Sequence, residues 1–297
     1  MYPCRIHDNL WILGNDYFHI YLLKGIKACA LVETGISATT DILLRQLSSL
    51  KVKPDFVIVT HPHSDHITGL DYLKNSFPDA RVIAGRGAET FMAHPKAAQS
   101  VIAEDFHMTK TMAARGLIKT KKVILFPPSL AGCRVVRQGE ELNLGDLTIN
   151  FYEAKGHAPG NILVRIPEIN TALVSDSLGN HYPGRGFFPT FFTGYVDYMA
   201  TINRLEKMNS DFLGLAHNGF FSSQEEIKNI FQKAVQCAND VRDYITQSKK
   251  NDDETAKDLF TFYYTDELAV YSPQNILNCC RLLVRRVREL KKNDKSG

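Results

Sequence analysis

The sequence predicts an α/β protein with mixed β-sheets and a helical C-terminal end. Three observations support this fold class. Short β-type runs follow one another near the N-terminus, strands alternate with helices after them, and amphipathic helical patterns fill roughly the last third. The chain has 297 residues, 44% of them apolar, which is enough to bury a sizeable core.

The N-terminal part predicts a meander of three strands followed by βα units. We expect the strands at residues 6–13, 17–23 and 28–33, separated by Gly, Asn and Asp turn signals. A helix is expected at about 39–50, because leucines and an isoleucine recur on one face. The apolar run 56–59, bounded by prolines, predicts a buried strand.

Four side chains that can bind metal follow this run within six residues. They are His61, His63, Asp65 and His66, and helical spacing resumes after them. On a tight loop His61 and His63 can reach one ion, while Asp65 and His66 turn toward a second. Imidazole nitrogen and carboxylate oxygen suit zinc, iron or manganese. One or two histidines would usually be structural, but this density after a strand predicts a metal site.

The middle of the chain contains a looser segment and then a second block of strands. Residues 86–128 predict a helical insertion, which either lies over the core or forms a lid. A strand is expected before it at 81–84. The second block is expected at 135–139, 147–153, 162–166 and 171–174.

Three further ligand candidates each lie at the end of a β-type run. His157 follows 147–153, Asp176 follows 171–174, and His217 ends the apolar stretch 212–216. Each alone would be read as a polar loop residue. Their repetition at strand ends predicts that they converge on one edge of a sheet.

The motif His61-x-His63-x-Asp65-His66, followed in order by His157, Asp176 and His217, resembles the metallo-β-lactamase-fold hydrolases. The resemblance covers residues 1 to about 222 and implies an αββα sandwich. Residues 21–23 and 31–37 also resemble the quinolone-signal-response thioesterases, which carry a helical C-terminal extension. The implied domains are 1–222, the catalytic domain with its insertion, and 223–297, the helical extension.

The resemblance also implies how the ligands divide between two divalent ions. His61, His63 and His157 would bind the first, Asp65, His66 and His217 the second, and Asp176 would bridge them. Zinc is the first choice, with iron or manganese as alternatives. The chain departs from the family pattern where Ala158 follows His157, where Ser175 precedes Asp176, and where Asn218 follows His217. None of these changes removes a ligand.

Two such ions imply hydrolysis by a bridging hydroxide, with Asp65 as the catalytic residue that orients it or passes its proton. The expected substrate is a thioester, as for glyoxalase II, or an ester. The alternatives are a lactonase or phosphodiesterase of the same fold, or a non-catalytic sensor that retains the metal site.

An aromatic loop after Asp176 could form an apolar substrate wall or pack onto the core. On the first interpretation the substrate residues are His181, Tyr182, Phe187, Phe188, Phe191, Phe192 and Tyr195.

The C-terminal part predicts helices at 196–208, 222–247, 254–264 and 272–291. The last is basic and amphipathic, which is typical of a packed helix with a solvated face, and less often of a membrane surface or an acidic cofactor. The formal charge of +3 gives no indication of nucleic-acid binding. With six scattered cysteines and no visible signal peptide or apolar span, we expect a cytoplasmic protein with a small-molecule substrate, no membrane association and scope for a homodimer.

Overall fold

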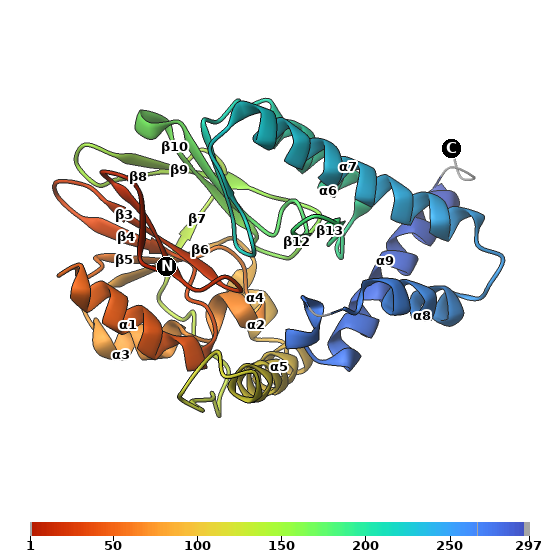
Figure 1. Ribbon diagram of the computed structural model, residues 1–297, viewed down its shortest axis with the longest axis horizontal. Coiled ribbons are helices and arrows are strands. Elements are labelled where there is room, and N and C mark those ends of the chain that lie inside the picture. Colours follow the sequence, from red (N-terminus) through yellow and green to blue (C-terminus); the bar gives the residue numbers. More distant parts are fainter. Residues whose placement is uncertain (1, 266, 294–297) are drawn as a thin grey trace.

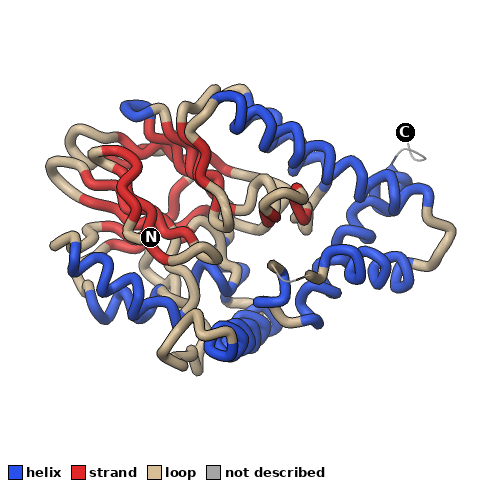
Figure 2. Tube along the Cα trace, in the orientation of Figure 1, coloured by secondary structure: helices blue, strands red, loops and turns tan. Residues whose placement is uncertain are grey.

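The computed structural model describes residues 2–265 and 267–293, and its sheets and helices form an αββα sandwich with helices added toward the C-terminus (Figure 1). The predicted fold class is confirmed. Residues 294–297 of the expected extension lie outside the described residues. The helices flank the strands rather than separating the two sheets (Figure 2).

The first sheet has seven strands in the order in which they occur in the chain. They are β1 (Cys4–His7), β2 (Leu10–Gly14), β3 (His19–Lys24), β4 (Cys29–Val32), β5 (Phe56–Val59), β6 (Arg81–Gly85) and β7 (Arg134–Val136). β1 to β4 pair antiparallel as the predicted meander, and β4 to β7 pair parallel. The meander expected to have three strands therefore has four, and the strands expected at 56–59 and 81–84 are β5 and β6.

The second sheet has six strands in the order β15-β14-β11-β10-β9-β8. They are β8 (Glu141–Asn143), β9 (Thr148–Glu153), β10 (Ile162–Ile166), β11 (Thr171–Ser175), β14 (Phe212–Leu215) and β15 (Phe220–Phe221). β9 and β11 each run antiparallel to β10, and β11 is parallel to β14. The carboxyl ends of β9, β11 and β14 therefore meet at one edge.

The helices occupy the two outer faces and the C-terminal side. They are α1 (Thr40–Ser49), α2 (Ser64–Ile67), α3 (Leu70–Ser76), α4 (Ala88–Met92), α5 (Pro95–Ala114), α6 (Tyr195–Glu206), α7 (Gln224–Gln247), α8 (Asp252–Tyr263) and α9 (Pro273–Asn293). The part of the chain that the structure describes also contains three short 3-10 helices, Ser37–Thr39, Pro167–Ile169 and Leu268–Val270. In the described residues, no helix is both long and apolar enough to cross a bilayer.

Alternation along the strands builds the layers. Along β3, Ile20 and Leu22 pack with Leu43 of α1 on the outer face, while Tyr21 and Leu23 face the second sheet. Side chains two apart on a strand point the same way, so one strand contributes to both layers. Apolar residues of α6 and α7 cover the outer face of the second sheet.

Two strand predictions were wrong in detail, and two strands were not predicted at all in the aromatic loop. The expected strand 6–13 is two strands, because the chain turns between His7 and Leu10, which pair with each other. The expected strand 135–139 belongs to the first sheet as β7, where it completes the parallel pairing beside β6. The aromatic loop contains a hairpin of β12 (Asn180–Tyr182) and β13 (Gly186–Phe188), because Pro183 and Gly184 lie in the turn between the two strands and leave the pairing intact.

Helices α7, α8 and α9 fill the region expected to be an extension. Their buried residues share one apolar cluster with α6 and the aromatic loop, so the C-terminal helices are packed onto the sandwich. α7 leads from the outer face of the second sheet to α8 and α9, which lie on the far side from β3 to β5 (Figure 1). The division at residue 222 stays a prediction.

Candidate metal centre

All seven predicted ligands lie at the carboxyl ends of strands. His61 and His63 follow β5, and Asp65 and His66 lie on α2. His157 follows β9, Asp176 follows β11 directly, and His217 follows β14. Because the two sheets are packed face to face, both contribute side chains to one place.

The loop that carries His157 depends on a glycine. Gly156 has a φ of +103°, and a Cβ at this position would lie 2.3 Å from the backbone nitrogen of Tyr198. A larger residue would therefore push the loop away from α6. The close approach holds the histidine at the edge of the sheet.

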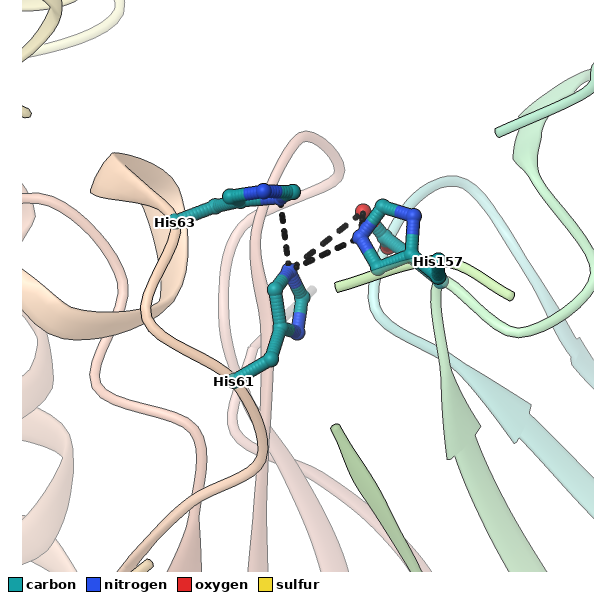
Figure 3. A group of neighbouring side chains, drawn as sticks. His61, His63 and His157 are labelled. Atoms are coloured by element: carbon teal, nitrogen blue, oxygen red, sulfur yellow. Dashed lines mark hydrogen bonds and ion pairs between the residues drawn. The ribbon is translucent and has the colours of Figure 1, made fainter. Parts of the chain in front are cut away.

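The first group consists of His61, His63, His157 and Asp176, whose candidate ligand atoms lie within 4.8 Å of one another. Nε2 of His61 lies 3.1 Å from Nδ1 of His63 and 3.1 Å from Nε2 of His157 (Figure 3). Zinc–nitrogen bonds of 2.0–2.1 Å at a tetrahedral angle place such nitrogens roughly 3.3 Å apart. The three imidazoles therefore nearly have the spacing that one ion requires.

The second group consists of Asp65, His66, His217 and Asp176, again within 4.8 Å. Asp65 Oδ2 lies 3.2 Å from His217 Nε2 and 3.4 Å from His66 Nε2. Asp176 is common to both groups: its Oδ1 is 3.3 Å from His217 Nε2, and its Oδ2 is 3.7 Å from His157 Nε2. This is the position that a bridging carboxylate would need.

Hydrogen bonds on the outer side orient several of these rings. Nδ1 of His157 donates to the carbonyl of Thr190 at 3.0 Å, and Nδ1 of His217 donates to the carbonyl of Tyr17 at 2.6 Å. Each bond leaves Nε2 as the atom that faces the group. Such outer contacts fix the tautomer and orientation of histidine ligands.

Glu33 organises the floor of the centre. Its Oε1 accepts hydrogen bonds from Thr60 at 2.6 Å and Ser175 at 2.7 Å, and its Oε2 lies 3.0 Å from Nδ1 of His66. Ser175 has a φ of +48°, a conformation in which glycine is more usual. The bond to Glu33 gives this serine a role in holding the floor of the centre.

The two groups differ in charge. Burial lowers the pKa of His61 and His157, and lowers that of His63 to about 3, so these imidazoles are neutral at pH 7. Burial also opposes the charge on His217, but Asp176 and Asp65 outweigh it and raise its pKa to about 10. Burial would raise the pKa of Asp65, but His66 and His217 outweigh it and keep the pKa well below its usual range. His66 also has a raised pKa, so without metal both histidines of the second group hold protons that balance the charges of Asp65 and Asp176. A divalent ion bound there would take the place of these protons.

A divalent metal fits both groups. Among the described residues, His66 Nε2, His217 Nε2 and Asp176 Oδ1 are buried and have no hydrogen-bond partner. Burying polar atoms unpaired is costly, so their convergence on one place fits the binding of a cation. Histidine nitrogen and carboxylate oxygen are common donors for zinc, iron and manganese. The clusters could therefore hold metal ions.

A cavity of about 340 Å³ opens beside the two groups. Its apolar lining comes from α4, α5, the aromatic loop and the C-terminal helices, and includes Phe91, Val101, Phe188, Phe192, Leu268, Ile276 and Leu282. Volumes of this order are typical of small-molecule sites. The insertion thus contributes to one wall of this cavity, through α4 and α5.

The structure separates the seven residues expected to contact substrate. Phe188 and Phe192 line the cavity, and the Phe192 ring lies 5.5 Å from that of His157. The other five pack elsewhere. His181 bonds to the carbonyl of Asn218, Tyr182 to that of Tyr263, and Tyr195 to the side chain of Asn239. Phe187 and Phe191 are buried in the apolar cluster around α6 and α7. Most of these residues therefore follow the second interpretation of the aromatic loop, in which it packs onto the core.

Sequence reasoning missed two polar residues of the centre. Glu33 had a recognisable signal, because a charged residue directly after an apolar strand and before Thr-Gly is unusual for a turn. Tyr271 had none. Its hydroxyl donates to Asp65 Oδ2 at 2.7 Å, across 206 positions in the chain. Only the packing of the C-terminal helices brings the two together.

Comparison with known proteins gives one family. The family model described as the metallo-beta-lactamase superfamily matches residues 16–241, well over half of the chain. A glyoxylase B2 of Dictyostelium discoideum is 22% identical over 182 residues, which cover 58% of this chain. The match spans about half of that relative, 52% of its length.

Two further comparisons cover a short segment and the whole fold. A hydroxyacylglutathione hydrolase of Francisella tularensis is 30% identical over 81 residues, 27% of this chain and 31% of that protein. The crystal structure of a beta-lactamase domain protein from Burkholderia ambifaria covers 97% of this chain and 88% of its own, with a TM-score of 0.69 and 15% identity. The structural likeness thus extends over the C-terminal helices.

Proposed function

The chain belongs to the metallo-beta-lactamase superfamily, and from this premise we propose that it is a dinuclear metal-dependent hydrolase acting on a thioester or ester with an apolar acyl group. The observation that carries the proposal is the convergence of seven side chains into two groups that share Asp176, at the edge of an apolar cavity.

The residues of the chain would divide the work of hydrolysis. Two divalent ions, if bound by these groups, would supply an activated water at neutral pH and a Lewis acid for the substrate carbonyl. Asp65, whose pKa lies well below its usual range, is ionised at neutral pH, so its carboxylate could accept a hydrogen bond that orients this water or relay its proton to the leaving group. His61, His63 and His157 hold their positions through buried contacts. Asp176 fixes the spacing between the two groups.

The cavity supports an apolar acyl group. The lining contains Phe91, Phe188 and Phe192, and the one lysine or arginine among its described residues is Arg286. Arg286 donates to the carbonyl of Phe192 at 2.8 Å and to Glu289 at 2.8 Å. A phosphodiester would need cationic groups free to meet it, so the lining favours an uncharged acyl chain.

The relatives support a thioester. A hydroxyacylglutathione hydrolase acts, by its name, on an acyl group attached to glutathione. The short matched segment limits this support to the reaction class. Cleavage of a thioester also needs less assistance for the leaving group than cleavage of an amide, because a thiolate is the better leaving group.

Metal analysis and a hydrolysis panel would test the proposal together. Protein purified without chelators should contain two divalent transition-metal ions per chain. The panel should contain acyl-CoA, S-acylglutathione, lactone and bis-nitrophenyl phosphate substrates, with the Asp176→Asn variant as the inactive control. Turnover confined to thioesters or esters is expected. Turnover confined to the phosphodiester would contradict the assignment, and metal with no turnover would indicate a sensor.

A further inference from the structure

A residue that precedes α9, Tyr271, bonds directly to one of the predicted metal ligands, Asp65. The Tyr271 hydroxyl donates to Oδ2 of Asp65 at 2.7 Å. This oxygen is the one that lies 3.2 Å from Nε2 of His217 and 3.4 Å from Nε2 of His66. A carboxylate oxygen has two lone pairs, so it can bind an ion and accept one hydrogen bond.

Tyr271 is held in place from several sides. Its side chain is 7% exposed, and its ring meets that of His217 edge-on, at 6.4 Å between centroids. Tyr264 donates its hydroxyl to the backbone carbonyl of Tyr271 at 3.0 Å. The hydroxyl that reaches Asp65 is therefore fixed relative to the second ligand group.

The next residue, Ser272, connects the same segment to α5, which also lines the cavity. Ser272 donates from its backbone nitrogen and its hydroxyl to the two carboxylate oxygens of Glu104, at 2.6 and 2.7 Å. Glu104 lies on α5 and is 5% exposed. Buried hydrogen bonds to a carboxyl group are among the stronger ones. The backbone at Tyr271 is thus held by the bond from Tyr264 to its carbonyl and by the bonds from Ser272 to Glu104.

We propose that Tyr271 is a positioning residue that sets the affinity of the second metal site by orienting Asp65. The inference rests on the proposed metal centre. A hydrogen bond from Tyr271 restricts rotation of the Asp65 carboxylate, so less freedom is lost when an ion binds. Removing partners that orient metal ligands typically costs a factor of about 10–100 in metal affinity or activity.

The test is a titration of metal-free protein with Zn²⁺ in competition with a chromophoric chelator, which gives the affinities of the first and second ions. His217→Ala identifies the step that belongs to the second site. In Tyr271→Phe, we expect the dissociation constant of the second ion to rise about 10- to 100-fold and that of the first to stay within about threefold. Tyr244→Phe is the matched control, because it removes a tyrosine–aspartate hydrogen bond of 2.6 Å in the same C-terminal region, to Asp258, which is not one of the seven ligands.

The outcomes separate this inference from the proposed function. Failure of the parental protein to bind two ions would remove the metal centre itself. Two ions bound equally well by the parent and Tyr271→Phe would overturn the inference alone. Equal weakening of both ions, with a lower melting temperature, would show a purely structural role and also overturn it. If Tyr271→Phe does not fold, Tyr264→Phe must weaken the second ion selectively, and unchanged affinity there refutes the inference.

Discussion

Phe191 and Phe192 are neighbours in the chain with opposite environments, so they make a matched pair for testing the substrate wall. Phe191 is 0% exposed and packs against Tyr195 and Tyr198, at 5.2 and 5.9 Å between ring centroids. Phe192 lines the cavity, with its ring 6.4 Å from that of His63. Alanine should therefore do different damage at the two positions.

The magnitudes follow from these environments. Phe191→Ala leaves a void in the core, which costs about 3–5 kcal/mol of unfolding free energy. Phe192→Ala removes a ring that a bound acyl group would cover, worth about 1.5–3 kcal/mol, or roughly a factor of 10–100 in binding. We expect Phe192→Ala to lower kcat/KM by this factor for long or aromatic acyl groups and to leave acetyl substrates nearly unchanged.

The assay combines denaturant unfolding with kcat/KM for a series of acyl chain lengths. Phe191→Ala should lower stability and change the chain-length preference little. If Phe192→Ala lowers kcat/KM equally for short and long chains, or if Phe191→Ala alters selectivity more than Phe192→Ala, the wall has been assigned to the wrong side of the loop.

Three further outcomes are expected. Asp176→Asn should lower kcat by orders of magnitude while circular dichroism stays native, and a parental rate would exclude Asp176 as the bridge. His61→Ala should leave about one ion per chain by elemental analysis, whereas retention of two would contradict its place in the first group. Burial, together with His217, lowers the pKa of His19 from 6.5 to about 4 in the folded protein. As the pH falls, His19 is therefore protonated in the unfolded chain before it is protonated in the folded protein. Stability from this group is present above pH 6.5 and is lost as the pH falls toward 4, by up to about 3 kcal/mol. His19→Gln should remove that slope from unfolding curves of metal-free protein, and parallel curves would refute the assignment.

The ligands could be predicted from sequence because each one follows a strand whose signal is local. β5 is found at the predicted residues, and His61 lies two positions beyond it. Asp176 and His217 repeat that pattern. Local signals also predicted α1 and α7 to within about two residues.

What could not be predicted depends on contacts between distant segments. β7 joins the first sheet by pairing with β6, although the long helical insertion separates these two strands in the sequence. The inward or outward direction of the aromatic residues depends on how α6 and α7 pack against the loop. Tyr271 reaches Asp65 only because the 3-10 helix Leu268–Val270 packs against α5, to which Ser272 also bonds through Glu104. Periodicity along the chain carries no information about such partners.

The ligands of each group come from both sheets, and this has a consequence for the lifetime of the protein. An ion bound by His61 and His157 would act as a cross-link between the two halves of the sandwich. A ligand that binds only the folded state, at 100 times its dissociation constant, adds about 2.7 kcal/mol of stability. Metal-starved chains should therefore open more often between the sheets and be cleaved sooner by proteases. Metal supply would then set the abundance of the protein as well as its chemistry.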